Sequence, residues 1–112
     1  MSAPVLNRRL MLEAPVRVAD GAGGYATVWS ALGEVWAEVL AGTGREATAV
    51  GTALSRIIYR ITVRAAPVDA PSRPRPGRRF REGTRLFKVI SVTERDQAGR
   101  YLVCQAEEET AA

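Results

Sequence analysis

The sequence DGAGGYATVWSALGEVWAEV, residues 20–39, places four turn-favouring residues within five positions ahead of a run rich in aromatic and branched residues. Gly33 interrupts that run. The pattern predicts a turn that leads into two strands or one bent strand. A phosphate-binding loop is disfavoured, because the glycines of GAGG match neither the G-x-x-x-x-G-K-[ST] spacing nor the G-x-G-x-x-G spacing, and strand-like residues follow them.

Trp29 and Trp36 are the largest side chains of this stretch, and we predict that they anchor the core or an interface. Because they are an odd number of residues apart, they would face opposite sides of an unbroken strand. A bulge or bend at Gly33 would bring both indoles onto a common face, where they would pack the core of the fold.

The segments on either side of this stretch differ in their periodicity. Before it, RRLMLEAPVRV places Leu10 and Leu12 on one face of a strand that becomes an edge or ends at Pro15. After it, Thr43 and Glu46 have capping-box spacing, so we predict one short helix within GTGREATAVGTALS, residues 42–55. The apolar residues at near-helical intervals there are Ala47, Val50 and Leu54.

The second half of the chain is dominated by strand patterns. RIIYRITVR, residues 56–64, alternates apolar side chains on one face with a charged second face. Residues 65–79 contain four prolines, which cannot donate to a sheet, and are predicted to form a long Pro/Arg-rich loop. A short strand at Phe80 and strands over residues 86–93 and 101–106, separated by the turn sequences REGT and DQAG, predict a meander.

These elements together predict a mainly β fold, namely a small β-barrel of about five or six strands with one short helix and long loops. The length of 112 residues fits a single domain over residues 1–112. We expect residues 1–7 and 107–112 to be flexible ends.

The composition argues against an enzyme. The chain has no His and one Cys, Cys104, so it lacks the usual zinc ligand sets, an internal disulfide and the catalytic triads that need His. The isolated carboxylates are expected to be solvated or salt-bridged; they are Asp20, Glu34, Glu38 and Glu46. We therefore predict no catalytic residue, no metal and no cofactor. The absence of an apolar run of about 18 residues and of a signal-peptide pattern predicts a soluble cytoplasmic product without a membrane partner.

Charge is distributed unevenly along the chain. Residues 45–100 hold thirteen of the sixteen basic residues against five acidic ones, and all the basic residues except Lys88 are Arg. Arg suits both protein interfaces and phosphate groups. Two functions therefore stay open: a small basic β-barrel that binds nucleic acid, and a module for protein assembly. The candidate interface arginines are Arg60, Arg64, Arg73, Arg75, Arg78 and Arg79.

The order of the motifs resembles that of the phage head-tail joining family, also called head-closure or stopper proteins, found in siphophages, prophages and gene transfer agents. The resemblance covers about residues 6–108, and it departs from the family in the longer Pro/Arg-rich stretch between Arg64 and Phe80. The residues that carry it are Leu6 and Arg9, Asp20 with Gly23 and Gly24, Trp29 with Trp36 and Ala37, Gly44 with Glu46, residues 59–64 and residues 86–90.

The resemblance implies a non-enzymatic protein of the virion neck, made in the cytoplasm of the bacterial host. It implies a homo-oligomeric ring of six or twelve copies, with the portal and adaptor on one side and the tail terminator and tail tube on the other. Packaged double-stranded DNA would occupy the channel without sequence specificity. The segment of about residues 42–55 would face that channel and retain the DNA, and its candidate gating residues are Thr43, Arg45, Glu46 and Thr48.

Overall fold

The computed structural model describes residues 3–42, 45–49 and 52–109, and it describes side chains outside residues 43–56. Eight strands follow one another along the chain, and the described residues contain no helix. The strands are β1 (Arg8–Ala19), β2 (Tyr25–Ala41), β3 (Arg45–Ala49), β4 (Thr52–Arg56), β5 (Ile58–Arg64), β6 (Arg79–Glu82), β7 (Arg85–Glu94) and β8 (Tyr101–Glu109).

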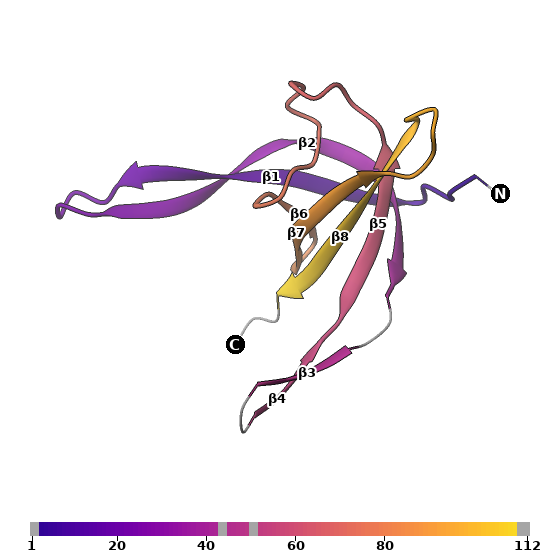
Figure 1. The fold of residues 1–112 in the computed structure, drawn as a ribbon. Helices are drawn as coiled ribbons and strands as arrows, with labels where there is room; N and C mark the ends of the chain where they lie inside the picture. Colours follow the sequence, from indigo (N-terminus) through magenta and orange to yellow (C-terminus); the bar gives the residue numbers. More distant parts are fainter. Residues whose placement is uncertain (1–2, 43–44, 50–51, 110–112) are drawn as a thin grey trace.

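Six antiparallel strands close into one hydrogen-bonded sheet in the order β1-β2-β5-β8-β7-β6. This closed sheet confirms the predicted mainly β class, but it is not a regular barrel. Strand β1 pairs with β2 over its whole length, whereas it meets β6 at only three positions, residues 11–13. The far half of the β1–β2 hairpin therefore extends beyond the closed sheet, as Figure 1 shows.

The predicted short helix is wrong for the residues that are described. Strands β3 and β4 form a separate two-stranded antiparallel sheet, in which Arg45 pairs with Arg56 and Ala49 pairs with Thr52. Thr48 and Thr52 are β-branched and lose side-chain freedom in a helix, so the pleated conformation is the better one for them. Thr43 lies outside the described residues.

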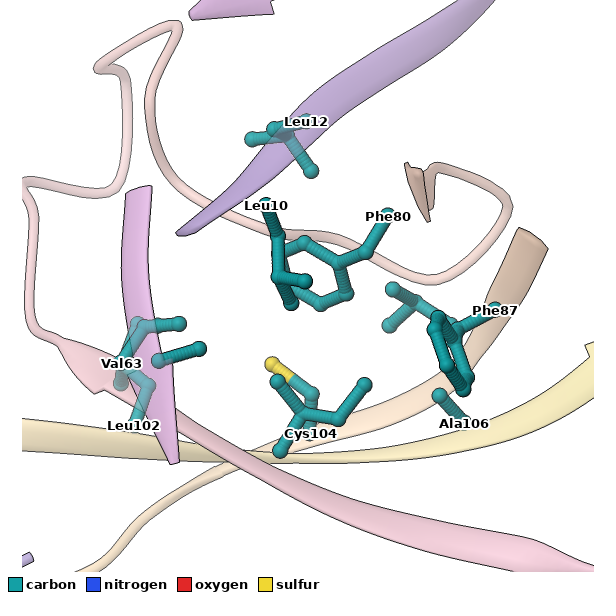
Figure 2. Close-up of a cluster of buried hydrophobic side chains, with 11 residues drawn as sticks. Leu10, Leu12, Val63, Phe80, Phe87, Leu102, Cys104 and Ala106 are labelled. Carbon is teal, nitrogen blue, oxygen red and sulfur yellow. The ribbon is translucent and has the colours of Figure 1, made fainter. Parts of the chain in front are cut away.

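The core fills the interior of the closed sheet. Its side chains alternate along β1, β5, β7 and β8, and β2 and β6 contribute one residue each. Figure 2 shows Phe80 and Phe87 reaching into it, with the sulfur of Cys104 directed toward the middle. The buried cluster contains Leu10, Leu12, Ala37, Ile61, Val63, Phe80, Phe87, Val89, Leu102, Cys104 and Ala106. Cys104 is thus a small core residue, as its place in the last strand predicts.

Strand β2 contains the bulge that the sequence predicts. Leu12 pairs with Gly33 and the next residue, Glu13, pairs with Ala31, so Leu32 is the extra residue. Gly33 has a φ of 144°, which L side chains rarely adopt. The bulge puts Trp29 and Trp36 opposite Pro15 and Arg9, two odd-numbered residues of β1, and therefore on one face of the sheet.

That common face is the outer one, which corrects the expectation that the two Trp fill the core. The inner face of β1 carries Leu10 and Leu12, whereas Trp36 lies opposite the exposed Arg9 and is itself 55% exposed. Trp29 is half-buried and is not part of the core cluster. The small interior of a six-stranded sheet is already occupied by Phe80 and Phe87, so the indoles are left outside it.

Residues near both ends of the described chain contact the closed sheet, contrary to the expectation from the sequence. Residues 107–109 continue β8, where Glu107 pairs with Ile58 and Lys88, so the expectation of a flexible end from residue 107 is corrected. Near the other end, the N–H of Val5 donates to Oε2 of Glu38 at 2.9 Å. Residues 1–2 and 110–112 lie outside the described residues.

Candidate assembly surfaces

The largest projection of the molecule is the part of the β1–β2 hairpin over residues 14–31, which we call the arm. It makes the molecule elongated, with extents of 52 × 39 × 24 Å and a radius of gyration of 15.5 Å, where a compact chain of this length would have about 13 Å. Pro15 does not end β1, because the strand has only β2 beside it here and proline is tolerated at a sheet edge. Figure 1 shows the arm extending away from the other strands.

The tip of the arm is built by the Gly-rich turn. Gly21 and Gly23 have φ values of 80° and 85°, which glycine adopts without strain. Oδ1 of Asp20 accepts hydrogen bonds from the N–H groups of Ala22 and Gly24, at 2.8 and 3.0 Å, and these bonds lower the pKa of Asp20. Asp20 therefore has a structural role, which is to stabilise the turn.

The two faces of the arm differ. Val16, Val18 and Val28 are exposed on the face that continues the inner side of the closed sheet. On the other face, the guanidinium of Arg17 lies 4.5 Å from the centre of the Tyr25 ring. An exposed apolar face on a two-stranded projection is a feature of surfaces that contact other proteins.

The root of the arm is fixed by a buried ion pair that the sequence analysis missed. Nε of Arg79 and Nε of Arg81, both on β6, donate to the two oxygens of Glu13 at 2.8 and 2.9 Å. Burial by itself would raise the pKa of Glu13, but the hydrogen bonds from the two arginines outweigh it and lower the pKa below its ordinary value. Arg79 also stacks on Trp29, so the arm, β1 and β6 are joined at one point.

A second projection is the β3–β4 hairpin, drawn in Figure 1 at the opposite end of β5 from the loop over residues 65–79. At its root, the N–H of Gly42 donates to the carbonyl of Ile58 at 2.6 Å. A Cβ at position 42 would collide with that carbonyl oxygen, so the close approach requires glycine here. Three of the candidate gating residues lie on β3, namely Arg45, Glu46 and Thr48.

The loop over residues 65–79, called here the Pro/Arg loop, is held together by its own arginines. Arg73 donates to the carbonyl of Ala66 at 2.8 Å and Arg75 donates to the carbonyl of Val68. Arg78 donates to the carbonyls of Pro71 and Arg73, at 3.3 and 2.8 Å. These three candidate interface arginines therefore brace the loop that carries them.

The six candidate interface arginines do not form one surface. Arg79 is in the root of the arm and its side chain is only 15% exposed, while Arg73, Arg75 and Arg78 are in the loop. Arg60 and Arg64 are exposed on the outer face of β5. Within the described part of the chain, neither of these two has an ion-pair partner.

The outer face of β2 and β5 carries a mixed aromatic and basic surface around Trp36. Leu40 pairs with Arg60, and Leu6, Trp36 and Arg64 line a shallow hollow of about 340 Å³. A second hollow of about 260 Å³ shares Trp36 and Arg64 with the first. We call the surface formed by Leu6, Trp36, Leu40, Arg60 and Arg64 the Trp36 surface.

Two further ion pairs connect strands of the closed sheet, one between β1 and β6 and one between β7 and β8. Arg8 pairs with Glu82, and Nε of Arg85 donates to Glu108 at 2.8 Å. Hydrogen bonds from these arginines lower the pKa values of Glu82 and Glu108. Local sequence patterns do not indicate these pairs, because their members are up to 74 positions apart in the chain.

The described residues offer no metal site of three or more His, Cys, Asp or Glu side chains. Among them there is also no helix that is long and apolar enough to cross a membrane. Burial raises the pKa of the Cys104 thiol to about 12, so this thiol is protonated and unreactive at neutral pH.

Comparison with known proteins agrees with a role in assembly. A family model described as "Phage head completion protein" matches residues 1–109. Among solved structures, a chain of the "Virion of native gene transfer agent (GTA) particle" is 55% identical to this one, with a TM-score of 0.82 over 98% of this chain and 100% of that chain. A search of curated proteins found no match.

Proposed function

This chain belongs to the phage head completion protein family, a family of structural, non-enzymatic proteins, and on that premise we propose that it closes the filled head of a phage-like particle. In this proposal it forms a homo-oligomeric ring between the portal-adaptor complex and the tail. The ring retains the packaged DNA and offers the surface to which the tail attaches.

The observation that carries the proposal is the match over nearly the whole chain to a component of a gene transfer agent virion. At 55% identity both the fold and the positions of the projections are expected to be shared. We therefore infer that this chain is also a virion component of a gene transfer agent or a related particle, positioned at its neck.

The geometry supports a connector because the closed sheet carries two hairpins at separate places. The arm over residues 14–31 exposes an apolar face, and β3–β4 projects elsewhere from the same sheet. A connector needs one set of contacts for each neighbour. We assign the β3–β4 hairpin, with Arg45, Glu46 and Thr48, to the channel, where it acts as the gate for DNA.

The alternative, a nucleic-acid-binding module, has less support. Such a module needs free cations beside exposed stacking aromatics. Four of the six candidate arginines bind groups of their own chain instead, and Phe80 and Phe87 are buried in the core. Arg60 and Arg64 are left on the same outer face as the exposed Trp36, and two free cations are few for binding a phosphate backbone. A channel that lets DNA pass also works best with a wall of mixed charge.

Electron microscopy of particles from a strain that lacks this protein tests the proposal. We expect tailless heads that have lost their DNA, beside free tails of full length. Expression of the wild-type chain from a plasmid should restore tailed, filled particles. Normal tailed particles in the deletion strain would refute the proposed function.

A further inference from the structure

We propose that the tip of the Pro/Arg loop, residues 67–69, docks on the Trp36 surface of a second copy of this chain. The inference deepens the proposed function, since it names the contact between neighbours in the oligomeric ring and rests on that ring. A second copy of this chain fits the Trp36 surface because the tip of the loop and that surface are chemically complementary.

The tip offers one apolar and one acidic side chain. Val68 is 72% exposed, the largest value among the exposed large hydrophobic residues of the described chain. Asp69 beside it is exposed and has no ion-pair partner within the described residues. An apolar side chain this exposed has an unfavourable contact with water, which burial against a neighbour would remove.

The loop presents this tip in a fixed shape. The guanidinium groups of Arg73, Arg75 and Arg78 bind four backbone carbonyls between residues 66 and 73, including that of Val68 itself. Pro74 is fully buried and ties the loop to the body of the protein. Because the loop is ordered before binding, a contact at its tip loses little conformational entropy.

The Trp36 surface is complementary to this tip, since it has an exposed apolar side chain and positive charges. Trp36 is 55% exposed and lines two hollows that a small apolar side chain could enter. Arg64 lines both hollows with Trp36, and Arg60 lies further along β5, opposite Leu40. Neither arginine has an ion-pair partner among the described residues, so each can pair with an acid from outside. Trp and Arg are the residues that most often dominate binding energy in interfaces.

The tip and the Trp36 surface are separate sites on one molecule. In its own chain, Val68 lines a hollow with Glu94 of β7 and Gly99, and Trp36 lines a different one with Arg64; Ala65 and Ala66, at the base of the loop, line both. A contact between two different sites of identical subunits is head-to-tail and can repeat around an axis until it closes. Asp69 would then face Arg64 of the next copy, and Val68 would face Trp36.

Cysteine cross-linking in assembled particles tests this contact. The full-length double variant Leu6→Cys with Val68→Cys is supplied to the deletion strain, and purified particles are mildly oxidised and run on a non-reducing gel. We expect a ladder of covalent multimers of this chain. The matched control, Ile90→Cys with Val68→Cys, pairs the same tip with an exposed position on β7 and should give none.

Two outcomes would overturn the inference: particles that contain the Leu6/Val68 variant at the wild-type level without a ladder, and equal ladders from the variant and its control. The native Cys104 is buried and adds no background. If instead the proposed function is wrong, the experiment gives a different result. In that case the wild-type chain is missing from particles, while cross-linking of the purified, concentrated protein still reports on the contact.

If the cysteine variants fail to enter particles, exchanging the charges of Asp69 and Arg64 tests the same contact. Asp69→Arg and Arg64→Asp should each reduce incorporation at least about tenfold, because like charges then meet at every contact. Co-expression of the two should restore it to within about threefold of wild type, since an alternating ring has complementary charges at every contact. No recovery on co-expression, with both variants folded, would overturn the proposal.

Discussion

Arg79 stacks on Trp29, with its guanidinium carbon 4.0 Å from the centre of the indole ring, and at the same time it donates to Glu13. One side chain of β6 therefore contacts both strands of the β1–β2 hairpin. The contact lies beside the bulge at Leu32, where the arm leaves the closed sheet. We conclude that the direction of the arm is fixed at its root.

Glu13→Gln should destabilise the protein by about 1.5–3 kcal/mol, because it weakens charged hydrogen bonds in a buried site. The folded-state pKa of Glu13 is lowered, so its stabilising effect is present above the ordinary value of 4.5 and is lost as the pH falls through the folded-state pKa. Urea unfolding from pH 7 to pH 3 should therefore show the difference between variant and wild type shrinking below about pH 4.5.

Glu34→Gln is the matched control for that measurement. Glu34 pairs with Arg9 at 3.3 Å, and both side chains are more than half exposed. An exposed pair contributes about 0–1 kcal/mol. An equal loss of stability in the two variants would contradict the importance that we give to Glu13.

Trp36→Ala and Phe87→Ala should have opposite effects on folding and on assembly. Phe87 is fully buried, so its truncation should cost about 3–5 kcal/mol of unfolding free energy. Trp36 is exposed, so its truncation should cost under about 1 kcal/mol but should greatly reduce incorporation into particles. Denaturant unfolding and immunoblotting of purified particles measure the two effects. Normal incorporation of Trp36→Ala would contradict an interface at this residue.

Gly42→Ala should loosen the root of the β3–β4 hairpin, since the added methyl group collides with the carbonyl of Ile58. We expect faster amide hydrogen exchange in residues 45–56, with global stability reduced by about 1–3 kcal/mol. Particles with this variant should retain less DNA. Ala41→Ser, one residue away at an exposed position, is the control and should behave as wild type.

The thiol of Cys104 should not react with an aromatic disulfide reagent at pH 8 while the protein is folded. Burial raises its pKa to about 12, so almost no thiolate is present. Unfolding in guanidinium chloride should release one reactive thiol per chain, as the sequence requires. Rapid reaction of the native protein would show that β8 opens easily.

Binding to a short DNA duplex should be weak and independent of sequence. We expect dissociation constants no tighter than about 10⁻⁶ M at physiological salt, the usual limit of non-specific binding. Fluorescence anisotropy with two unrelated duplexes at several salt concentrations measures this. Tight binding that discriminates between the duplexes would favour the nucleic-acid module over the connector.

Local sequence patterns predicted most of the closed sheet. The strands predicted over residues 56–64, 86–93 and 101–106 from alternation and turn residues correspond to β5, β7 and β8, and Gly33 correctly indicated the bulge. The face to which Trp29 and Trp36 belong was not predictable in this way. It depends on which side of β1 becomes the interior, and that is decided when β6 closes the sheet.

The candidate sites were harder to predict because they depend on long-range pairing. The clustering of arginines in residues 73–79 indicated an interface, yet these side chains turn back on backbone carbonyls or bind Glu13. Short-range patterns carry no information on such contacts. Capping-box spacing at Thr43 and Glu46 likewise favoured a helix, although the described residues of this segment pair as strands.

The short pairing between β1 and β6, at three positions, also determines when the sheet can close during synthesis. Glu13 leaves the ribosome early, but its partner Arg79 follows 66 residues later, so the sheet cannot close until β6 has emerged. Until then the edge of β1 stays open, as does that of β2 until β5 has emerged, and open strand edges make nascent chains prone to associate wrongly. Pro15 lies on one of those edges and offers no N–H to an intruding strand. The same proline that shapes the finished arm thus protects the unfinished chain.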